Sequence, residues 1–101
     1  MKYSIYRDRL GKVFSNYMER TYDNIRIDEY FNLVDGDPDE DRYLCGLYYQ
    51  DGEFVLKVPY WSRVIKPLSN TFGDMWEQLL FDYYKDMMSK SGFLISKIVV
   101  E

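Results

Sequence analysis

The sequence contains no histidine and no alanine, and its single cysteine is Cys45. Without histidine, the chain lacks the side chain that proteins most often use as a general base and as a metal ligand. One cysteine excludes a disulfide within the chain. No apolar run approaches the length of a membrane span, and no secretory leader pattern opens the sequence. We therefore expect a soluble cytoplasmic protein, in the host cytoplasm if it is viral.

The composition is that of one folded domain. A chain of 101 residues with 47% hydrophobic and 30% charged residues fits a single globular domain spanning residues 1–101. Aromatic residues make up 19%, and such large side chains let a small domain build an adequate core. The net charge of −4 disfavours a general electrostatic attraction to nucleic acid.

The first part of the chain has helical periodicity. Its apolar residues from Tyr3 to Met18 recur at steps of three and four, which predicts an amphipathic helix over residues 2–21. Gly11 lies at the edge of this stripe, at a cost of about 1 kcal/mol relative to alanine. It indicates either the close approach of another element or no special role. We interpret four basic residues as the solvated face of this helix: Arg7, Arg9, Lys12 and Arg20.

A second helix is predicted over residues 75–90. Asp74 and Glu77 have the spacing of a capping box just before an apolar run, which marks a helix start. Gly92 is placed to end the helix in a left-handed conformation. Upstream of it, Pro67 limits any earlier helix to a turn or two.

The clearest strand pattern is a hairpin within residues 42–60. Asp51 and Gly52 lie between two alternating apolar runs, which is the strongest short pattern for a two-residue β-turn. The turn fixes the register and predicts a buried face of four cross-strand pairs: Tyr49 with Phe54, Leu47 with Leu56, Cys45 with Val58, and Tyr43 with Tyr60. Pro59 cannot donate a ladder hydrogen bond, so the ladder ends there or the strand is an edge.

Two further strands complete the predicted sheet. Residues 24–34 alternate in part, and Glu29 interrupts them, so we expect a bulge or an outer edge; a short helix after Asp28 is the competing interpretation. Residues 93–100 are apolar on both faces, which fits a central strand covered on both sides, or one covered on one side and partnered on the other. The predicted fold is an α+β two-layer sandwich: a mainly antiparallel four-stranded sheet with two long helices on one face, in the order helix, strand, strand, strand, short helix, helix, strand.

Residues 35–41 read DGDPDED and form the most acidic stretch. Their alternate aspartates resemble the first ligands of a calcium loop, but the required glycine and glutamate at the sixth and twelfth positions are absent, which excludes an EF-hand. We expect a solvated turn between strands. The alternatives are an irregular weak cation site and an acidic contact for a basic partner, made by Asp35, Asp37, Asp39, Glu40 and Asp41.

The second helix is apolar over an unusually wide arc. Phe81, Tyr84 and Met88 extend the apolar surface beyond the stripe that a helix lying on one sheet needs. Either the first helix packs beside the second and covers them, or they reach the surface and bind a partner, together with exposed Trp61. The sequence leaves both alternatives open.

The sequence does not predict catalysis. Cys45 faces the core in the predicted register, where a thiol is usually inert. Phosphate loops, nucleophile elbows and Cys/His clusters are absent from the sequence. We therefore expect no enzymatic activity, no cofactor and no metal.

A binding role is the leading hypothesis. The missing alanine and abundant tyrosine indicate an AT-rich coding genome, and small acidic domains of this kind are typical of viral accessory proteins and of bacterial immunity proteins. We expect a non-catalytic inhibitor or accessory protein, encoded by a virus, phage or bacterium, that blocks a protein partner sterically. The alternative is a self-associating, homodimeric structural protein. A carboxylate-dependent enzyme and a nucleic-acid-binding protein are less favoured.

Overall fold

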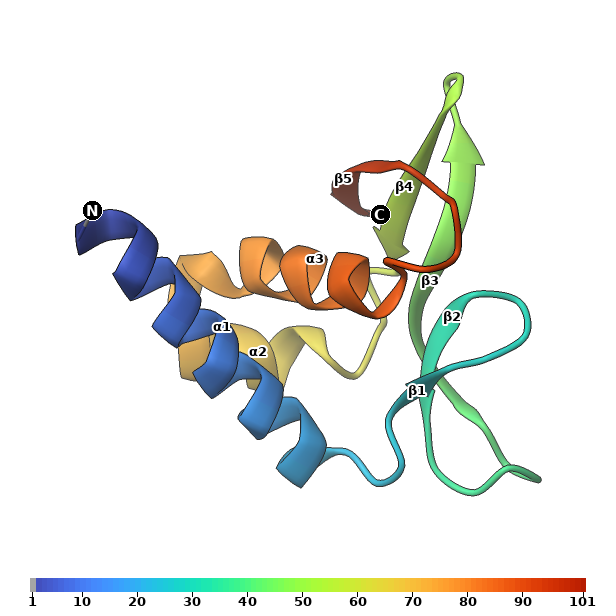
Figure 1. Cartoon of the computed structure of the whole chain (residues 1–101). Coiled ribbons are helices and arrows are strands. Elements are labelled where there is room, and N and C mark those ends of the chain that lie inside the picture. The colour runs from blue at the N-terminus through green and yellow to red at the C-terminus, as the bar shows by residue number, and fades with distance from the viewer. Residues whose placement is uncertain (1) are drawn as a thin grey trace.

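The computed structural model describes the backbone of residues 2–101 and the side chains from residue 8 onward. Three helices lie on one side of a sheet (Figure 1). The elements in chain order are α1 (Lys2–Thr21), β1 (Arg26–Ile27), β2 (Asn32–Asp35), β3 (Arg42–Gln50), β4 (Glu53–Val58), α2 (Ile65–Phe72), the 3₁₀ helix η1 (Gly73–Met75), α3 (Trp76–Met87) and β5 (Ile95–Val100). The α+β class is as predicted, and the first helix has the predicted bounds.

The sheet has five strands rather than the predicted four. Their order is β1-β2-β3-β4-β5, the first four strands pair antiparallel, and β5 pairs parallel with β4. A parallel neighbour requires a long crossover, which α2, η1 and α3 provide. The strand predicted over residues 93–100 begins at Ile95 and lies at an edge, so the prediction of a central strand was wrong.

The extra strand arises because residues 24–34 form two short strands instead of one. The Asp28 carboxylate accepts hydrogen bonds from the backbone N–H groups of Tyr30 (2.9 Å) and Asn32 (2.8 Å), which turns the chain between β1 and β2. Phe31 has a φ of 66° within this turn. Glu29 interrupts the strand pattern because it lies in the turn, not in a bulge or a helix.

The predicted hairpin register is confirmed near the turn. Leu47 pairs with Leu56 and Tyr49 pairs with Phe54 across β3 and β4. Further from the turn, β4 ends at Val58, so the predicted pair of Tyr43 with Tyr60 does not form. Cys45 and Val58 are both fully buried, as predicted, and Cys45 also pairs with Leu33 of β2. Tyr49 was predicted on the buried face but is 60% exposed. The first half of β3 is therefore paired with β2, and its second half is paired with β4.

The second predicted helix, residues 75–90, is α3 and is shorter than predicted, and the short helix before it is longer. Pro67 lies in the first turn of α2, where its missing N–H would have had no helical partner, so the helix continues to Phe72. Asp74 belongs to η1, and α3 begins at Trp76 without a side-chain cap, so the predicted capping box does not form. Gly92 has the predicted positive φ, 88°, but it follows the helix end at Met87 by several residues.

The core lies between the three helices and the inner face of the sheet. Aromatic rings join the helices: the Phe14 ring of α1 lies 5.2 Å from that of Phe72 in α2 and 5.6 Å from that of Tyr83 in α3. Leu56 from the sheet and Leu80 from α3 are fully buried in the same cluster. Each fully buried side chain of this size contributes about 1.5–3 kcal/mol.

Candidate binding surfaces

The helix patch predicted to bind a partner is not at the surface. Tyr84 is fully buried, Met88 is 3% exposed, and Phe81 is partly buried against the core. The prediction that these three residues form an exposed binding surface was therefore wrong. The alternative, that the first helix packs beside the second and covers these residues, is confirmed only in part: α1 contacts Tyr83, whereas Tyr84 is bonded to the β1–β2 turn.

Two elements cover that arc from different sides. Tyr83 packs edge-on against Phe14 of α1, as the ring distance above shows. Tyr84 points the other way, and its hydroxyl donates a hydrogen bond to the carbonyl of Phe31 in the β1–β2 turn. Because α3 lies between α1 and this turn, it needs apolar residues around more of its circumference than a helix on a sheet alone.

The acidic stretch is divided between a buried residue and a solvated loop. Asp35 is 2% exposed, and its carboxylate pairs with Arg63 and, at 3.3 Å, with Arg42. Asp41 pairs with Arg26. Asp35 is therefore part of the folded framework and is not available to a partner, contrary to its predicted role in an acidic contact.

The rest of the stretch matches the predicted solvated turn. Gly36 has a φ of 93°, and its carbonyl accepts hydrogen bonds from Asn24 and Arg26. Asp37, Asp39 and Glu40 are exposed. Within the described residues, no group of three or more Cys, Asp or Glu side chains is placed to hold a metal ion. A contact with a basic partner remains a prediction for these three exposed carboxylates.

Trp61 is 63% exposed, as expected of a partner-binding residue, and it borders a surface that the sequence did not single out. Its ring centroid lies 6.1 Å from that of Tyr43. Because Leu56 and Val58 of β4 face the core, the alternate residues Val55 and Lys57 point to the opposite side of the sheet. We call this side the outer face, and the strand pairings assign it Asn32, Val34, Tyr43, Gly46, Tyr48, Val55, Lys57 and Val99, with Trp61 beside them.

On the outer face, partly exposed aromatic rings lie over buried valine side chains. Val34 and Val55 are 2% and 0% exposed although neither belongs to the main core cluster. Tyr48 remains 49% exposed, and the Lys57 ammonium lies 4.1 Å from its ring centroid. No helix of residues 2–101 covers this side of the sheet (Figure 1). The register set by the Asp51–Gly52 turn places Tyr48 opposite Val55, but no pattern in the sequence indicates that this face carries exposed aromatic rings.

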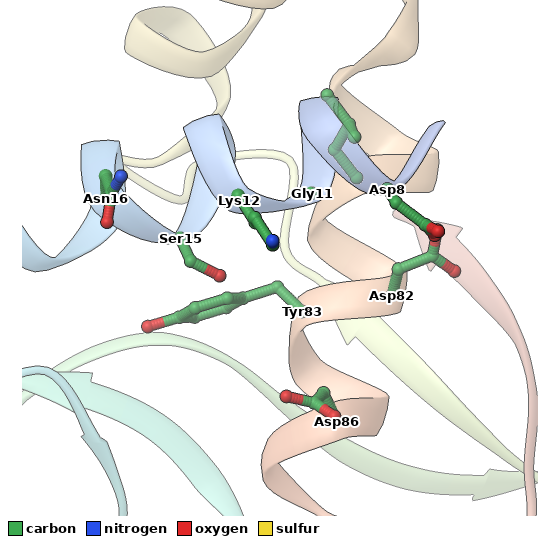
Figure 2. Close-up of a pocket in the computed structure, with 9 residues that line it drawn as sticks. Asp8, Gly11, Lys12, Ser15, Asn16, Asp82, Tyr83 and Asp86 are labelled. Atoms are coloured by element: carbon green, nitrogen blue, oxygen red, sulfur yellow. The ribbon is translucent and has the colours of Figure 1, made fainter. Parts of the chain in front are cut away.

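A groove of about 760 Å³ runs between α1 and α3 (Figure 2). Its α1 wall has the spacing i, i+3, i+4, i+7 and i+8, and its α3 wall has the spacing i, i+3, i+4 and i+7, so each wall is one helix face. The lining residues are Asp8, Gly11, Lys12, Ser15 and Asn16 from α1, and Leu79, Asp82, Tyr83 and Asp86 from α3.

The groove is acidic at its walls and partly apolar at its base. Among the described side chains, three carboxylates and the Lys12 ammonium line it, and one of the carboxylates, that of Asp82, accepts a hydrogen bond from Gln78 at 2.9 Å. Leu79 is 3% exposed, and the Tyr83 ring is partly buried beside it. Burial, with a smaller effect from the Glu19 carboxylate, raises the pKa of Tyr83 to about 12, so its hydroxyl stays neutral and protonated near neutral pH.

Cys45 is fully buried in the core, as the sequence predicts, and burial raises the pKa of its thiol well above the usual range. A buried thiol of this kind is a poor nucleophile.

Among the described helices, none is long and apolar enough to cross a membrane. The Arg7 side chain, one of the four predicted basic residues of the first helix, lies outside the described side chains.

Comparison with protein-family models, with curated proteins and with solved structures finds no match to this chain.

Proposed function

We propose that the chain is a non-catalytic protein-binding domain that acts by covering a surface of a partner protein, and that the outer face is the surface it uses. The observation that carries this proposal is the exposure of Trp61 and Tyr48 on a side of the sheet that no helix of the described chain covers. Exposed aromatic residues on a rigid element are the side chains that most often dominate protein interfaces.

The proposed mode of action is steric blocking, as an inhibitor or accessory protein would use. The rings of Tyr43, Tyr48 and Trp61 would supply the apolar anchor, and Lys57 a cation at its margin. Exposed carboxylates in the loop at residues 37–40 would steer a basic partner during approach without contributing much to affinity. A viral, phage or bacterial origin is the part of this proposal that rests on composition alone.

The test is affinity capture from a lysate of the encoding organism or its host, with matched variants of the tagged chain. Trp61→Ser and Tyr48→Ser should each weaken capture of the same partner by about tenfold or more, since truncating a central interface aromatic typically removes over 1.4 kcal/mol. Leu94→Ser is the control, because Leu94 is 89% exposed and lies outside the outer face. If the outer-face variants capture the partner as well as the wild type does, the proposed surface is wrong.

A further inference from the structure

The outer face carries hydrogen-bond donors that have no acceptor within the described chain. The indole N–H of Trp61 and the ammonium group of Lys57 can only donate, and neither is hydrogen-bonded to a described residue. The same holds for the hydroxyl of Tyr48, whose ring is 49% exposed beside the Lys57 ammonium. A ligand that complements this face therefore brings more acceptors than donors.

The charge of the outer face differs from that of the whole chain. Three carboxylates border the face, and each already has a partner: Asp28 with backbone N–H groups of the β1–β2 turn, Glu53 with Lys97 at 3.1 Å, and Glu101 with Gln50 at 3.5 Å. Among the described residues Lys57 has no carboxylate partner, although the net charge of the chain is −4. The complementary group on a ligand is a carboxylate.

The rings of Tyr43 and Trp61 form the apolar part of the same face. Their centroids lie 6.1 Å apart and their planes are inclined by 43°, so neither ring covers the face of the other. Aromatic surfaces of this kind bind proline-rich segments, because the polyproline II conformation is preformed and loses little entropy on binding. Proline has no N–H group and leaves backbone carbonyls free, which matches the donors of the outer face.

The spacing along β3 fits the same kind of ligand. Lys57 pairs with Gly46, which lies three residues beyond Tyr43 in β3. Three strand residues extend roughly 10 Å, and three residues of polyproline II extend about 9 Å at 3.1 Å each. Because polyproline II has three residues per turn, positions i and i+3 lie on the same side of the segment. A proline at the Tyr43 and Trp61 rings therefore places the side chain three positions away at Lys57.

We propose that the outer face binds a proline-rich segment of its partner in the polyproline II conformation, with a glutamate or aspartate three residues from a proline. The proline packs on the rings of Tyr43 and Trp61, and the carboxylate pairs with Lys57. The inference rests on the proposed function, since it names the partner of the same face. The exposed carboxylates of residues 37–40 precede β3 on the Tyr43 side, so the basic residues that they attract lie beyond the proline end of the segment.

The experiment measures fluorescence anisotropy of labelled probes as the intact chain is titrated to about 1 mM. The probes are the peptides Gly-Pro-Pro-Pro-Glu-Pro-Pro-Gly, Gly-Pro-Pro-Pro-Lys-Pro-Pro-Gly and Gly-Ala-Ala-Ala-Glu-Ala-Ala-Gly, and the single-stranded RNA hexauridylate. The wild type should bind the first peptide at least about tenfold more tightly than each other probe. No binding of the first peptide, equal binding of either other peptide, or tighter binding of hexauridylate through base stacking would overturn the proposal.

A charge exchange locates the carboxylate. Lys57→Glu should weaken binding of the glutamate peptide about tenfold and make the lysine peptide the tighter ligand. Lys66→Glu is the matched control: it changes the net charge equally at an exposed position of α2, on the helix side of the sheet (Figure 1), and should alter either affinity by less than about twofold. Equal effects of the two variants, or an unchanged preference in Lys57→Glu, would show that Lys57 does not bind the carboxylate.

An aromatic variant locates the proline site and separates this inference from the proposed function. Trp61→Ser should weaken binding of the glutamate peptide about tenfold, with circular dichroism showing the variant folded, because Trp61 is 63% exposed. If no peptide binds but Trp61→Ser still weakens capture of the protein partner, the proline-rich ligand is rejected and the proposed function stands. If neither Trp61→Ser nor Tyr48→Ser weakens capture, the outer face itself is rejected, and this inference with it.

Discussion

At the scale of single residues, the buried carboxylate of Asp35 shows how an acidic stretch can contribute to the fold. Its side chain is 3% exposed, whereas the side chains of Arg42 and Arg63 are 56% and 43% exposed. The carboxylate therefore depends on the arginines for compensation of its charge, while each arginine can reach water. Removing the two arginines should therefore destabilise the protein more than removing the charge of Asp35.

The double variant Arg42→Met, Arg63→Met should destabilise the protein by about 3–5 kcal/mol, the usual effect of leaving a buried charge without its partner. Asp35→Asn should have a smaller effect, about 1–3 kcal/mol, the typical loss of hydrogen bonds to charged groups. Urea denaturation of both variants at neutral pH measures the difference. Adding Asp35→Asn to the double variant should recover stability; a further loss would show that the carboxylate is not what the arginines stabilise.

Tyr22 makes a second prediction at this scale, for alkaline pH. Its hydroxyl is buried and makes no hydrogen bond with any described residue, and burial is the main cause that raises its pKa to about 12. An unfolded tyrosine ionises near pH 10, so between about pH 10 and 12 the unfolded state loses a proton that the folded state keeps. Stability should be insensitive to this group below about pH 9 and should fall as the pH rises through that window.

Tyr22→Phe removes this titration and should make the fall in unfolding free energy between about pH 9 and 11 shallower than in the wild type. The fall should not vanish, because burial also raises the pKa values of Tyr43 and Tyr83 to about 12. Urea denaturation at the two pH values provides the comparison, and Tyr30→Phe, at a 71% exposed position, is the control. An identical fall in wild type and Tyr22→Phe would contradict the assignment.

At the scale of elements, the pairing of β2 with β3 depends on close contact at Gly46. This residue pairs with Asn32, and a Cβ atom at position 46 would overlap the Asn32 side-chain oxygen and lie 3.3 Å from the Tyr43 ring. Gly46→Ala should therefore destabilise the protein by about 1–3 kcal/mol, as overpacking usually does. Asn32→Ser added to Gly46→Ala should relieve most of the added loss, and a double-mutant cycle measures this coupling. Strictly additive losses would show that the two residues do not collide.

The elements that the sequence predicted well are those fixed by local pattern. The first helix has a long apolar periodicity, and the Asp51–Gly52 turn sets its own register, so neither depends on distant contacts. The errors lie where distant segments decide. Residues 24–34 turn back because Asp28 binds the chain ahead of it, and Tyr84 is buried because Phe31, far away in sequence, accepts its hydrogen bond.

The candidate sites were harder to predict for the same reason. Trp61 was predicted only as an extension of the patch of Phe81, Tyr84 and Met88, which does not form, and its neighbour Tyr43 was assigned to the buried face. That error follows from the irregular register between β2 and β3 beside Leu33 and Val34, which no local pattern reveals. The groove needs two helices to be placed side by side, so its acidic lining cannot be recognised from either helix alone.

At the scale of the whole molecule, both edges of the sheet are poorly suited to pairing with another copy. One edge is β1, which has only two residues. The other is β5, whose pairing with β4 shifts register between Ile95 and Ile98, and whose Lys97 lies exposed and bonded to Glu53 at 3.1 Å. Short edge strands, irregular register and edge lysines are features by which proteins avoid edge-to-edge association.

We therefore expect a monomer, with a mass of 12.3 kDa by light scattering after size exclusion over at least a tenfold concentration range. A constant monomeric mass leaves the outer face free for a different protein, which the proposed function requires. A mass that rises toward twice this value would instead favour self-association, and two variants would then locate the contact. Trp61→Ser would restore the monomer if the outer faces meet. A charged substitution at a β5 position outside the outer face, Val100→Lys, would restore it if the sheets join at that edge, because Val100 is 38% exposed and pairs with core-facing Val58.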